Sequence, residues 1–289
     1  MAEFVLVGGG WLGAWAWREV ARELTARGHR AVPVTLTGLG DRRHLATKET
    51  GLSTHVDDIV QVLDHAELTD PVVVGHSYGI FPVVAAVDRR PRAVSRIVYL
   101  DTGVPQDGDT VAGTFMDDTR RAAVRERVDA EGEGWRFPLP PAERLAEWGS
   151  VSGLDEEALA RMRRLAAPHP YACFTEPVRI DGAVWSLPSS GVFCTDNGVS
   201  IAGVEALYAA GDPRLRGLAD REVTLFELAT GHYPMLSVPR ELAGVLVDAA
   251  EGRGHRLGTG AESGAGAEGG AGVEGGAGVE GGAGGSPAE

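Results

Sequence analysis

Residues 71–79 read Pro-Val-Val-Val-Gly-His-Ser-Tyr-Gly, and the apolar stretch 80–87 follows directly. The apolar run before the glycine predicts a buried strand, and the stretch after the second glycine is compatible with a helix. The pattern G-x-S-x-G at a strand-to-helix turn strains the backbone and exposes the serine Oγ at the end of a sheet. Glycine on either side leaves room for strand and helix to approach. The segment predicts that Ser77 is a nucleophile rather than a serine in an ordinary loop.

Strands and helices alternate on both sides of this motif. Short apolar runs predict strands over 4–7, 31–36, 72–74, 97–100, 191–194 and 223–228. Amphipathic stretches predict helices over 14–27, 55–66, 80–87 and 239–250, the first ending at Gly28. This alternation predicts an α/β fold with a mostly parallel sheet covered by helices on both faces.

Residues 105–185 interrupt the alternation. They are charged, broken by proline and weakly helical over 117–130, 141–148 and 155–166. Their phenylalanines and tryptophans are Phe115, Trp135, Phe137, Trp148, Phe174 and Trp185. An insertion of this size between strands predicts a helical cap over the active site. Each single aromatic is better explained by packing inside the insertion.

The chain ends in a stretch of glycine, alanine and glutamate that contains the near-repeat Gly-Ala-Gly-Val-Glu-Gly. Such a segment has little to bury, so we predict a disordered tail over 252–289. The expected organisation is then a core of residues 1–104 and 186–251, a cap of residues 105–185, and this tail.

Composition limits the partners. The chain has 289 residues, 43% of them hydrophobic, and a formal net charge of -14, which argues against nucleic acid or an anionic membrane surface. The first residues lack a basic region and no apolar stretch approaches membrane-spanning length, so we expect a cytoplasmic protein. Cys173 and Cys194 form neither a disulfide framework nor a metal-type pattern. We expect a small-molecule substrate and leave a homodimer open.

A nucleophilic serine needs a histidine to take its proton and a carboxylate to orient that histidine. With the serine on this kind of turn, the expected chain order is serine, acid, histidine. His232 fits, because it lies between the last expected strand and the last expected helix. His76 adjoins the serine but would point elsewhere, so we interpret it as structural.

Two aspartates are candidates for the acid. Asp196 follows the strand 191–194, which is the usual place, and Asp101 ends the strand 97–100, which we expect beside the nucleophile strand. Either could instead be an ordinary turn aspartate. The oxyanion hole needs two backbone N–H groups. We expect them from Tyr78, which follows the serine, and from Gly10 in the loop after the first strand.

Several motifs in order carry a family resemblance: residues 4–17, Thr37-Gly-Leu-Gly-Asp-Arg42, Gly51-Leu-Ser-Thr-His55, Gly75-His-Ser-Tyr-Gly79, Tyr99-Leu-Asp-Thr-Gly-Val-Pro105 and Thr230-Gly-His-Tyr-Pro-Met235. Together they resemble bacterial α/β-hydrolases of the pyrethroid-hydrolase and salicylate-esterase type. That group is itself similar to plant methyl esterases and hydroxynitrile lyases. The resemblance covers about residues 4–250 and implies the α/β-hydrolase fold and a serine-dependent site.

The chain departs from that family at three places. Gly8-Gly9 stands where relatives usually have His-Gly or Pro-Gly, and Ile80 stands where the turn usually continues with glycine. By the register of the plant-like members, Asn197 occupies the acid position and Asp196 falls one residue early. An asparagine cannot stabilise an imidazolium as a carboxylate does. The resemblance favours Asp101, because it stands in the Tyr-Leu-Asp run of this branch.

Two rival site types fit the sequence less well. Gly8-Gly-Gly-Trp-Leu-Gly13 satisfies the dinucleotide-binding pattern, but Thr35-Leu-Thr37 stands where the ribose-binding acid is expected. A short-chain reductase would also need a Tyr-x-x-x-Lys pair, and Lys48 is the only lysine. For metal hydrolysis, Asp41, His44, His55, Asp57 and Asp58 lie close in sequence but lack the short histidine pairs of catalytic zinc. They are better explained as a solvated loop and a helix start.

The sequence therefore predicts a serine hydrolase that cleaves a carboxylic ester or lactone of a small, largely apolar substrate, without cofactor or metal. One alternative is a lyase, cyclase or isomerase of the same fold that uses Ser77 and His232 for proton transfer, which the glycine at position 8 favours. The other is a binding protein on the same fold, as in plant hormone receptors, which a complete serine–histidine pair argues against.

Overall fold

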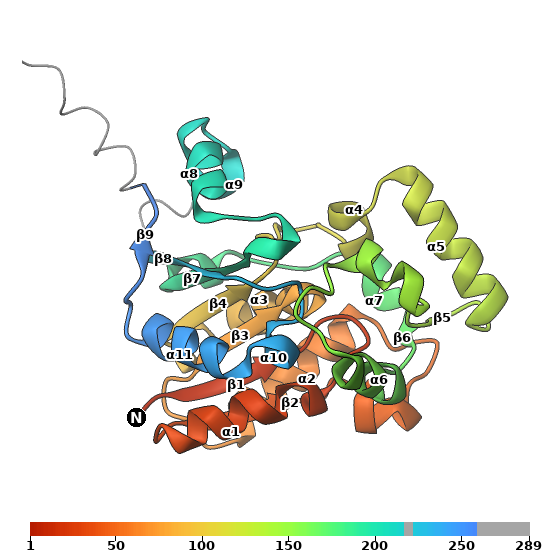
Figure 1. Ribbon diagram of the computed structural model, residues 1–289, viewed down its shortest axis with the longest axis horizontal. Helices are drawn as coiled ribbons and strands as arrows, with labels where there is room; N and C mark the ends of the chain where they lie inside the picture. The colour runs from red at the N-terminus through yellow and green to blue at the C-terminus, as the bar shows by residue number, and fades with distance from the viewer. Residues whose placement is uncertain (217–221, 259–289) are drawn as a thin grey trace, which may run out of the picture.

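A computed structural model describes residues 1–216 and 222–258 of the chain, and Figure 1 shows its arrangement. The main sheet is formed by β1 (Glu3–Val7), β2 (Arg30–Val34), β3 (Val72–His76), β4 (Arg96–Leu100), β7 (Ser189–Cys194), β8 (Val223–Leu228) and β9 (His255–Arg256). The strand order is β2-β1-β3-β4-β7-β8-β9, and every pairing except β8–β9 is parallel. The predicted α/β fold with a mostly parallel sheet is confirmed.

The sheet is buried on both faces, which explains why its strands read as continuous apolar runs. Successive side chains of a strand point to opposite faces. In β1, Phe4 and Leu6 pack on one side with α1 (Arg18–Ala26) and α11 (Pro239–Ala250). Val5 and Val7 pack on the other side, with helices α2 (Leu52–His65) and α3 (Ile80–Arg89) (Figure 1). Two hydrophobic layers therefore hold the central strands in a fixed register.

The helices follow the sequence pattern with shifts at their ends. The stretch expected over 14–27 begins as the 3-10 turn η1 (Ala14–Trp17) before α1, and Gly28 ends it with a φ of 82°. α2 (Leu52–His65) begins earlier than predicted, and α3 (Ile80–Arg89) extends two residues further. The other short elements of the core are η2 (Gly40–Leu45), η3 (Ser77–Gly79), η4 (Pro91–Ala93), η7 (Thr195–Asn197), α8 (Ile201–Ala209), α9 (Pro213–Arg216) and α10 (Pro234–Ser237).

The segment predicted as a cap gathers at the right of Figure 1. Its elements are α4 (Val111–Phe115), α5 (Asp118–Glu131), β5 (Arg136–Phe137), η5 (Ala142–Trp148), α6 (Glu156–Leu165), β6 (His169–Pro170), α7 (Ala172–Thr175) and η6 (Ala183–Ser186). β5 and β6 form an antiparallel pair. The ring of Phe137 packs on Trp11 of the core with a centroid separation of 5.2 Å. At least this aromatic therefore joins the insertion to the core and does not pack only inside the insertion.

The start of the predicted tail needs correction. His255 and Arg256 pair with β8 as strand β9, and the Glu205 carboxylate accepts hydrogen bonds from the Gly258 N–H at 2.9 and 3.1 Å. These contacts make residues 252–258 part of the fold. Their sequence, Gly-Arg-Gly-His-Arg-Leu-Gly, shares glycine with the segment after them but lacks its alanine and glutamate. The remainder of the predicted tail, residues 259–289, lies outside the described residues. Within the described part of the chain, no helix is both long enough and apolar enough to cross a membrane.

Asp88 of α3 connects the core to the end of the cap segment. Its carboxylate accepts hydrogen bonds from the backbone N–H groups of Asp181, Gly182 and Val184 at 2.6, 3.1 and 2.8 Å. Asp88→Ala leaves these donors without their acceptor, so we expect the free energy of unfolding to fall by about 2–4 kcal/mol. Denaturant titration measures this loss.

Asp57→Ala is the matched control. The Asp57 carboxylate forms an exposed ion pair with Arg89 at 2.9 Å. Such pairs contribute about 0.2–1 kcal/mol. Equal destabilisation by the two substitutions would contradict the role assigned to Asp88.

Candidate active site

Ser77 lies at the carboxyl end of β3, at the start of η3. Its φ of 50° places a non-glycine residue in the left-handed region, where backbone strain is expected. A Cβ added to Gly75 would lie 2.8 Å from the Ile80 Cα, and one added to Gly79 would lie 2.5 Å from the Gly8 carbonyl oxygen. Both glycines are therefore required by close approach of the backbone, as the motif predicts. Ile80, the unusual residue after the motif, is fully buried.

His232 lies in the loop between β8 and α10, and its Nδ1 is 2.6 Å from the Asp101 Oδ2. Both side chains are buried. Asp101 follows β4, the neighbour of β3 in the sheet, and its Oδ1 accepts a hydrogen bond from the Cys194 N–H at 3.0 Å. The structure thus places Asp101, one of the two predicted acids, on the histidine.

The pKa of the Asp101 carboxyl reflects opposing effects. Burial alone would raise it, because a desolvated carboxylate is disfavoured. The hydrogen bond and the charge of His232 outweigh burial, and the Cys194 N–H adds to them, so the pKa lies below its usual value. Asp101 is therefore ionised, and its carboxylate can accept a hydrogen bond from the neighbouring imidazole.

Asp196, the other candidate acid, has an exposed side chain that points elsewhere. Its Oδ2 accepts a hydrogen bond from the Ser152 hydroxyl at 2.7 Å. The next residue, Asn197, is the one that reaches the site. Its Nδ2 donates to Asp101 Oδ2 at 2.8 Å and lies 3.3 Å from His232 Nδ1, while its Oδ1 accepts from the Ser150 N–H at 2.7 Å. Asn197 is thus not the acid of the site, but it donates a hydrogen bond to the carboxylate of Asp101.

Residues 149–153 form a strap, which we name the cap strap, against the histidine loop. The His232 N–H donates to the Ser150 carbonyl at 2.7 Å, and the Gly231 N–H donates to the Ser152 carbonyl at 3.1 Å. A Cβ added to Gly149 would lie 2.4 Å from the His232 ring. This strap was not predicted from the sequence, because no motif marks a loop whose role is contact with a distant histidine.

His76 supports the histidine loop from the other side. Its Nε2 lies 2.7 Å from the His232 carbonyl oxygen, which can only accept, so this nitrogen donates. Burial, with a smaller effect of the nearby His232, lowers the pKa of His76 to about 3. The ring is therefore neutral, and it holds the main chain of the histidine loop in place.

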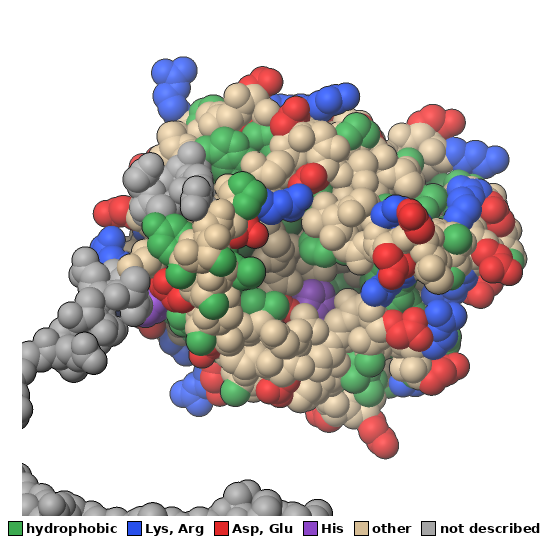
Figure 2. Space-filling view, turned by 90° about the horizontal axis from the view of Figure 1, so that it is seen from above, with side chains coloured by type: hydrophobic (Ala, Val, Ile, Leu, Met, Phe, Trp, Pro, Cys, Tyr) green, Lys and Arg blue, Asp and Glu red, His purple; other side chains and the backbone are tan. Residues whose placement is uncertain are grey.

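A cavity of about 610 Å³ opens at this point, with Gly10, Ser77, Tyr78, Asp101 and His232 in its wall. Figure 2 shows the hollow from above, with histidine atoms visible inside it. Much of the remaining wall is apolar, from both core and cap: Trp11, Val111, Phe115, Met116, Trp148, Phe174, Phe193, Leu207, Leu225 and Tyr233. The predicted nucleophile, histidine, acid and oxyanion residues all line one cavity.

Close packing against this site explains the glycines of the loop after β1 without a role in phosphate binding. A Cβ added to Gly9 would lie 2.7 Å from His76 Nδ1 and 3.0 Å from the Ser77 Cβ. A Cβ added to Gly13 would lie 3.0 Å from the Gly40 Cα. The loop therefore needs glycine in order to approach the serine turn and the loop of η2.

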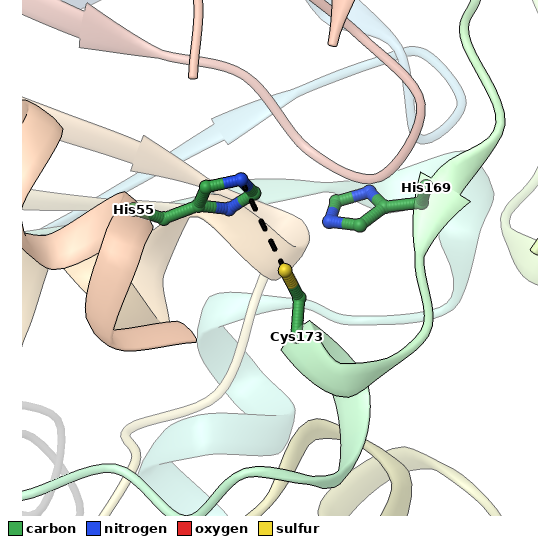
Figure 3. Close-up of side chains that lie close together, drawn as sticks. All are labelled: His55, His169 and Cys173. Atoms are coloured by element: carbon green, nitrogen blue, oxygen red, sulfur yellow. Dashed lines mark hydrogen bonds between the residues drawn. The ribbon is translucent and has the colours of Figure 1, made fainter. Parts of the chain in front are cut away.

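Among the described residues, His55, His169 and Cys173 form a group whose potential metal-ligating atoms lie within 4.8 Å of one another (Figure 3). These residues do not fit a metal ion. Both His55 nitrogens are already used, 2.7 Å from the Tyr78 hydroxyl and 2.8 Å from the Thr37 carbonyl oxygen. Burial raises the pKa of the Cys173 thiol to about 12, whereas a metal ligand is a thiolate. His55, which we expected at a helix start, lies in the first turn of α2, and its side chain is fully buried.

Comparison with known proteins agrees with this geometry. A family profile described as the alpha/beta hydrolase family matches residues 4–245. The carbendazim hydrolyzing esterase of Nocardioides sp. (strain SG-4G) is 41% identical over 111 residues, which are 38% of this chain and 46% of that esterase. Methylesterase 8 of Arabidopsis thaliana is 33% identical over 103 residues, or 35% of this chain and 38% of the relative. The chain thus matches less than half the length of each of these curated relatives.

Solved structures extend the likeness over most of the chain. An extracellular alpha/beta-hydrolase from a Paenibacillus species has a TM-score of 0.70 at 21% identity, covering 86% of this chain and 99% of that one. A pyrethroid hydrolase from Sphingobium faniae JZ-2 has a TM-score of 0.65 at 21% identity, covering 86% and 97%. These similarities show the fold.

Gly149→Ala tests the contact between the cap strap and the histidine. The added methyl group would overlap the His232 ring and displace it, and a misplacement of about 1 Å can cost about 100-fold in rate. We expect a fall of about 10- to 100-fold in kcat/KM, measured with an aryl ester in a folded variant.

Gly103→Ala is the control, because Gly103 lines the same cavity but an added Cβ meets nothing within 4 Å. Its activity should equal that of the wild type. Wild-type activity in Gly149→Ala would show that the strap does not constrain the histidine.

Proposed function

The chain belongs to the alpha/beta hydrolase family, whose profile covers residues 4–245, and we propose that it is a serine hydrolase that cleaves a carboxylic ester or lactone. The observation that carries this proposal is the 2.6 Å contact between His232 Nδ1 and Asp101 Oδ2, in the wall of the cavity that Ser77 also lines. The names of the curated relatives support it, since they are a carbendazim hydrolyzing esterase and methylesterases.

In this proposal Asp101 fixes the tautomer of His232. The carboxylate accepts the Nδ1–H, so Nε2 carries the lone pair that removes the proton from the Ser77 hydroxyl. The serine Oγ then attacks the substrate carbonyl carbon. The imidazolium formed at this step is stabilised by Asp101, which remains ionised because its pKa is lowered.

The backbone N–H groups of Gly10 and Tyr78 hold the oxyanion of the tetrahedral intermediate. As the intermediate collapses, His232 returns its proton to the leaving alkoxide and an acyl-serine remains. Water, deprotonated by the same histidine, attacks the acyl group and releases the acid. These steps need only protein groups and water, and no cofactor or metal enters.

The cavity favours a small, largely apolar substrate. Trp148 and Phe115 of the cap and Phe193 of the core all line its wall. Removing an apolar group from water contributes about 25 cal/mol per Å² of buried surface, so such walls favour apolar ester groups over polar ones. The cytoplasmic location remains a prediction from the sequence, and a homodimer is left open.

A lyase, cyclase or isomerase using the same serine and histidine is the alternative. Its support from the sequence was the doubtful acid and the glycine at position 8, where relatives usually have histidine or proline. A Cβ added to Gly8 would lie 3.2 Å from the Leu12 Cβ and 3.5 Å from the Trp17 Nε1. Tight packing accounts for this glycine without a change of reaction, so the hydrolytic function is favoured.

Asp101→Asn is the test of the proposed triad. The amide cannot accept the Nδ1–H through an ionised oxygen and favours the wrong histidine tautomer. By analogy with serine proteases, kcat should fall by roughly 10³–10⁴-fold. Steady-state hydrolysis of 4-nitrophenyl acetate and butyrate measures the loss.

Asp196→Asn is the matched control, because its carboxylate contacts Ser152 and not His232. It should keep wild-type turnover. If Asp196→Asn loses orders of magnitude while Asp101→Asn keeps full turnover, the assignment of the acid is wrong.

A further inference from the structure

His55, His169 and Cys173 form a group of buried polar side chains that the mechanism above does not use (Figure 3). His55 comes from α2 of the core, whereas His169 comes from β6 and Cys173 from α7. Neither imidazole is exposed to solvent. Buried polar groups are costly unless they are hydrogen-bonded, so the partners of these two rings indicate what they hold.

His169 holds the residue that follows Gly10. The Trp11 N–H donates to His169 Nδ1 at 3.2 Å, and the Ala167 N–H donates to the Trp11 carbonyl at 3.1 Å. The Trp11 indole N–H donates to the Phe137 carbonyl at 2.9 Å. The insertion thus contacts this one residue at its backbone donor, its backbone acceptor and its side chain.

These contacts matter because Trp11 has a φ of 63°. A bulky residue avoids this left-handed conformation, and the conformation persists only where the surroundings enforce it. Without its partner, the peptide between Gly10 and Trp11 is free to rotate toward a relaxed geometry. This peptide is next to the one that carries the Gly10 N–H. Its rotation would therefore change the direction in which the Gly10 N–H points.

His55 holds the other donor residue. The Thr37 carbonyl can only accept, so His55 Nε2 carries the proton and its Nδ1 accepts from the Tyr78 hydroxyl at 2.7 Å. The Tyr78 ring also meets the His169 ring edge-to-face, with a centroid separation of 4.4 Å. The two imidazoles therefore meet at Tyr78, whose backbone N–H is the second donor.

We infer that His55 and His169 are positioning residues that fix the two backbone donors of the oxyanion hole, so that the insertion completes the catalytic machinery as well as covering it. This inference rests on the proposed hydrolytic function. Both rings must be neutral to accept these hydrogen bonds. Burial is the main cause that lowers the pKa of His55 to about 4 and that of His169 well below its usual value, so the required form is the stable one.

The test compares His169→Asn with His169→Leu. The asparagine Oδ1 is the same number of bonds from the backbone as the histidine Nδ1 and can accept from the Trp11 N–H. Leucine retains apolar bulk but has no acceptor. We expect kcat for 4-nitrophenyl butyrate to fall about 10- to 100-fold in the leucine variant with KM within about twofold, since loss of an oxyanion donor costs about 10²–10³. The asparagine variant should keep kcat within about fivefold of wild type.

Tyr78→Phe tests the second contact without changing the ring or the backbone donor. It removes only the hydroxyl that bonds His55, and we expect a fall in kcat of about 5- to 10-fold at unchanged KM. Thermal melting of each variant separates these effects from loss of folding. If the leucine variant does not fold, the asparagine and phenylalanine variants still decide: the inference requires a near-native kcat in the first and a lowered kcat in the second.

Equal kcat values for His169→Leu and His169→Asn, whether native or reduced, would overturn the inference, as would full activity of Tyr78→Phe. Ser77→Ala in the same assay distinguishes a failure of the positioning role from a failure of the proposed hydrolytic function. If Ser77→Ala is inactive while the two His169 variants are equal, only the positioning role fails. If Ser77→Ala is as active as wild type, the proposed function itself fails.

Discussion

The hydrogen bond between His232 and Asp101 is the interaction on which the rest of the site depends. It joins the loop after β8 to the end of β4, and β7 lies between these two strands in the sheet. Several hydrogen bonds keep the two side chains at this short distance. The Cys194 N–H and the Asn197 amide donate to the carboxylate. Ser150 and His76 form hydrogen bonds with the backbone of His232. A carboxylate buried among so many donors is ionised and fixed in place.

The insertion contacts the site at two places. The cap strap, residues 149–153, holds the histidine loop, and the β5–β6 region holds the loop that carries Gly10. Because these contacts are hydrogen bonds to specific backbone atoms, they fix geometry more tightly than apolar packing alone. The same segment that shapes the apolar cavity thus also aligns the groups that would act on a bound ester.

Much of this arrangement was predictable from the sequence. Strand burial and the G-x-S-x-G turn are local patterns, so the parallel sheet and the place of Ser77 follow from them, and chain order selects His232. The acid was less certain, because Asp101 and Asp196 both end strands and differ only in where their side chains point. The supporting role of Asn197, which was noted only as a departure at the acid position, and the role of His169 were not predicted, because their partners lie 96 and 158 residues away. His255 was assigned to the tail, because a strand of two residues is too short to leave a pattern in the sequence that reveals its pairing with β8.

The most direct test of the account is the intact mass of the protein after exposure to a fluorophosphonate, compared between wild type and Ser77→Ala. Such a probe is attacked by a serine only when a neighbouring base, here His232, activates it. The account predicts one adduct on the wild type and none on the variant. A folded wild type without adduct, or an equal adduct on Ser77→Ala, would contradict it.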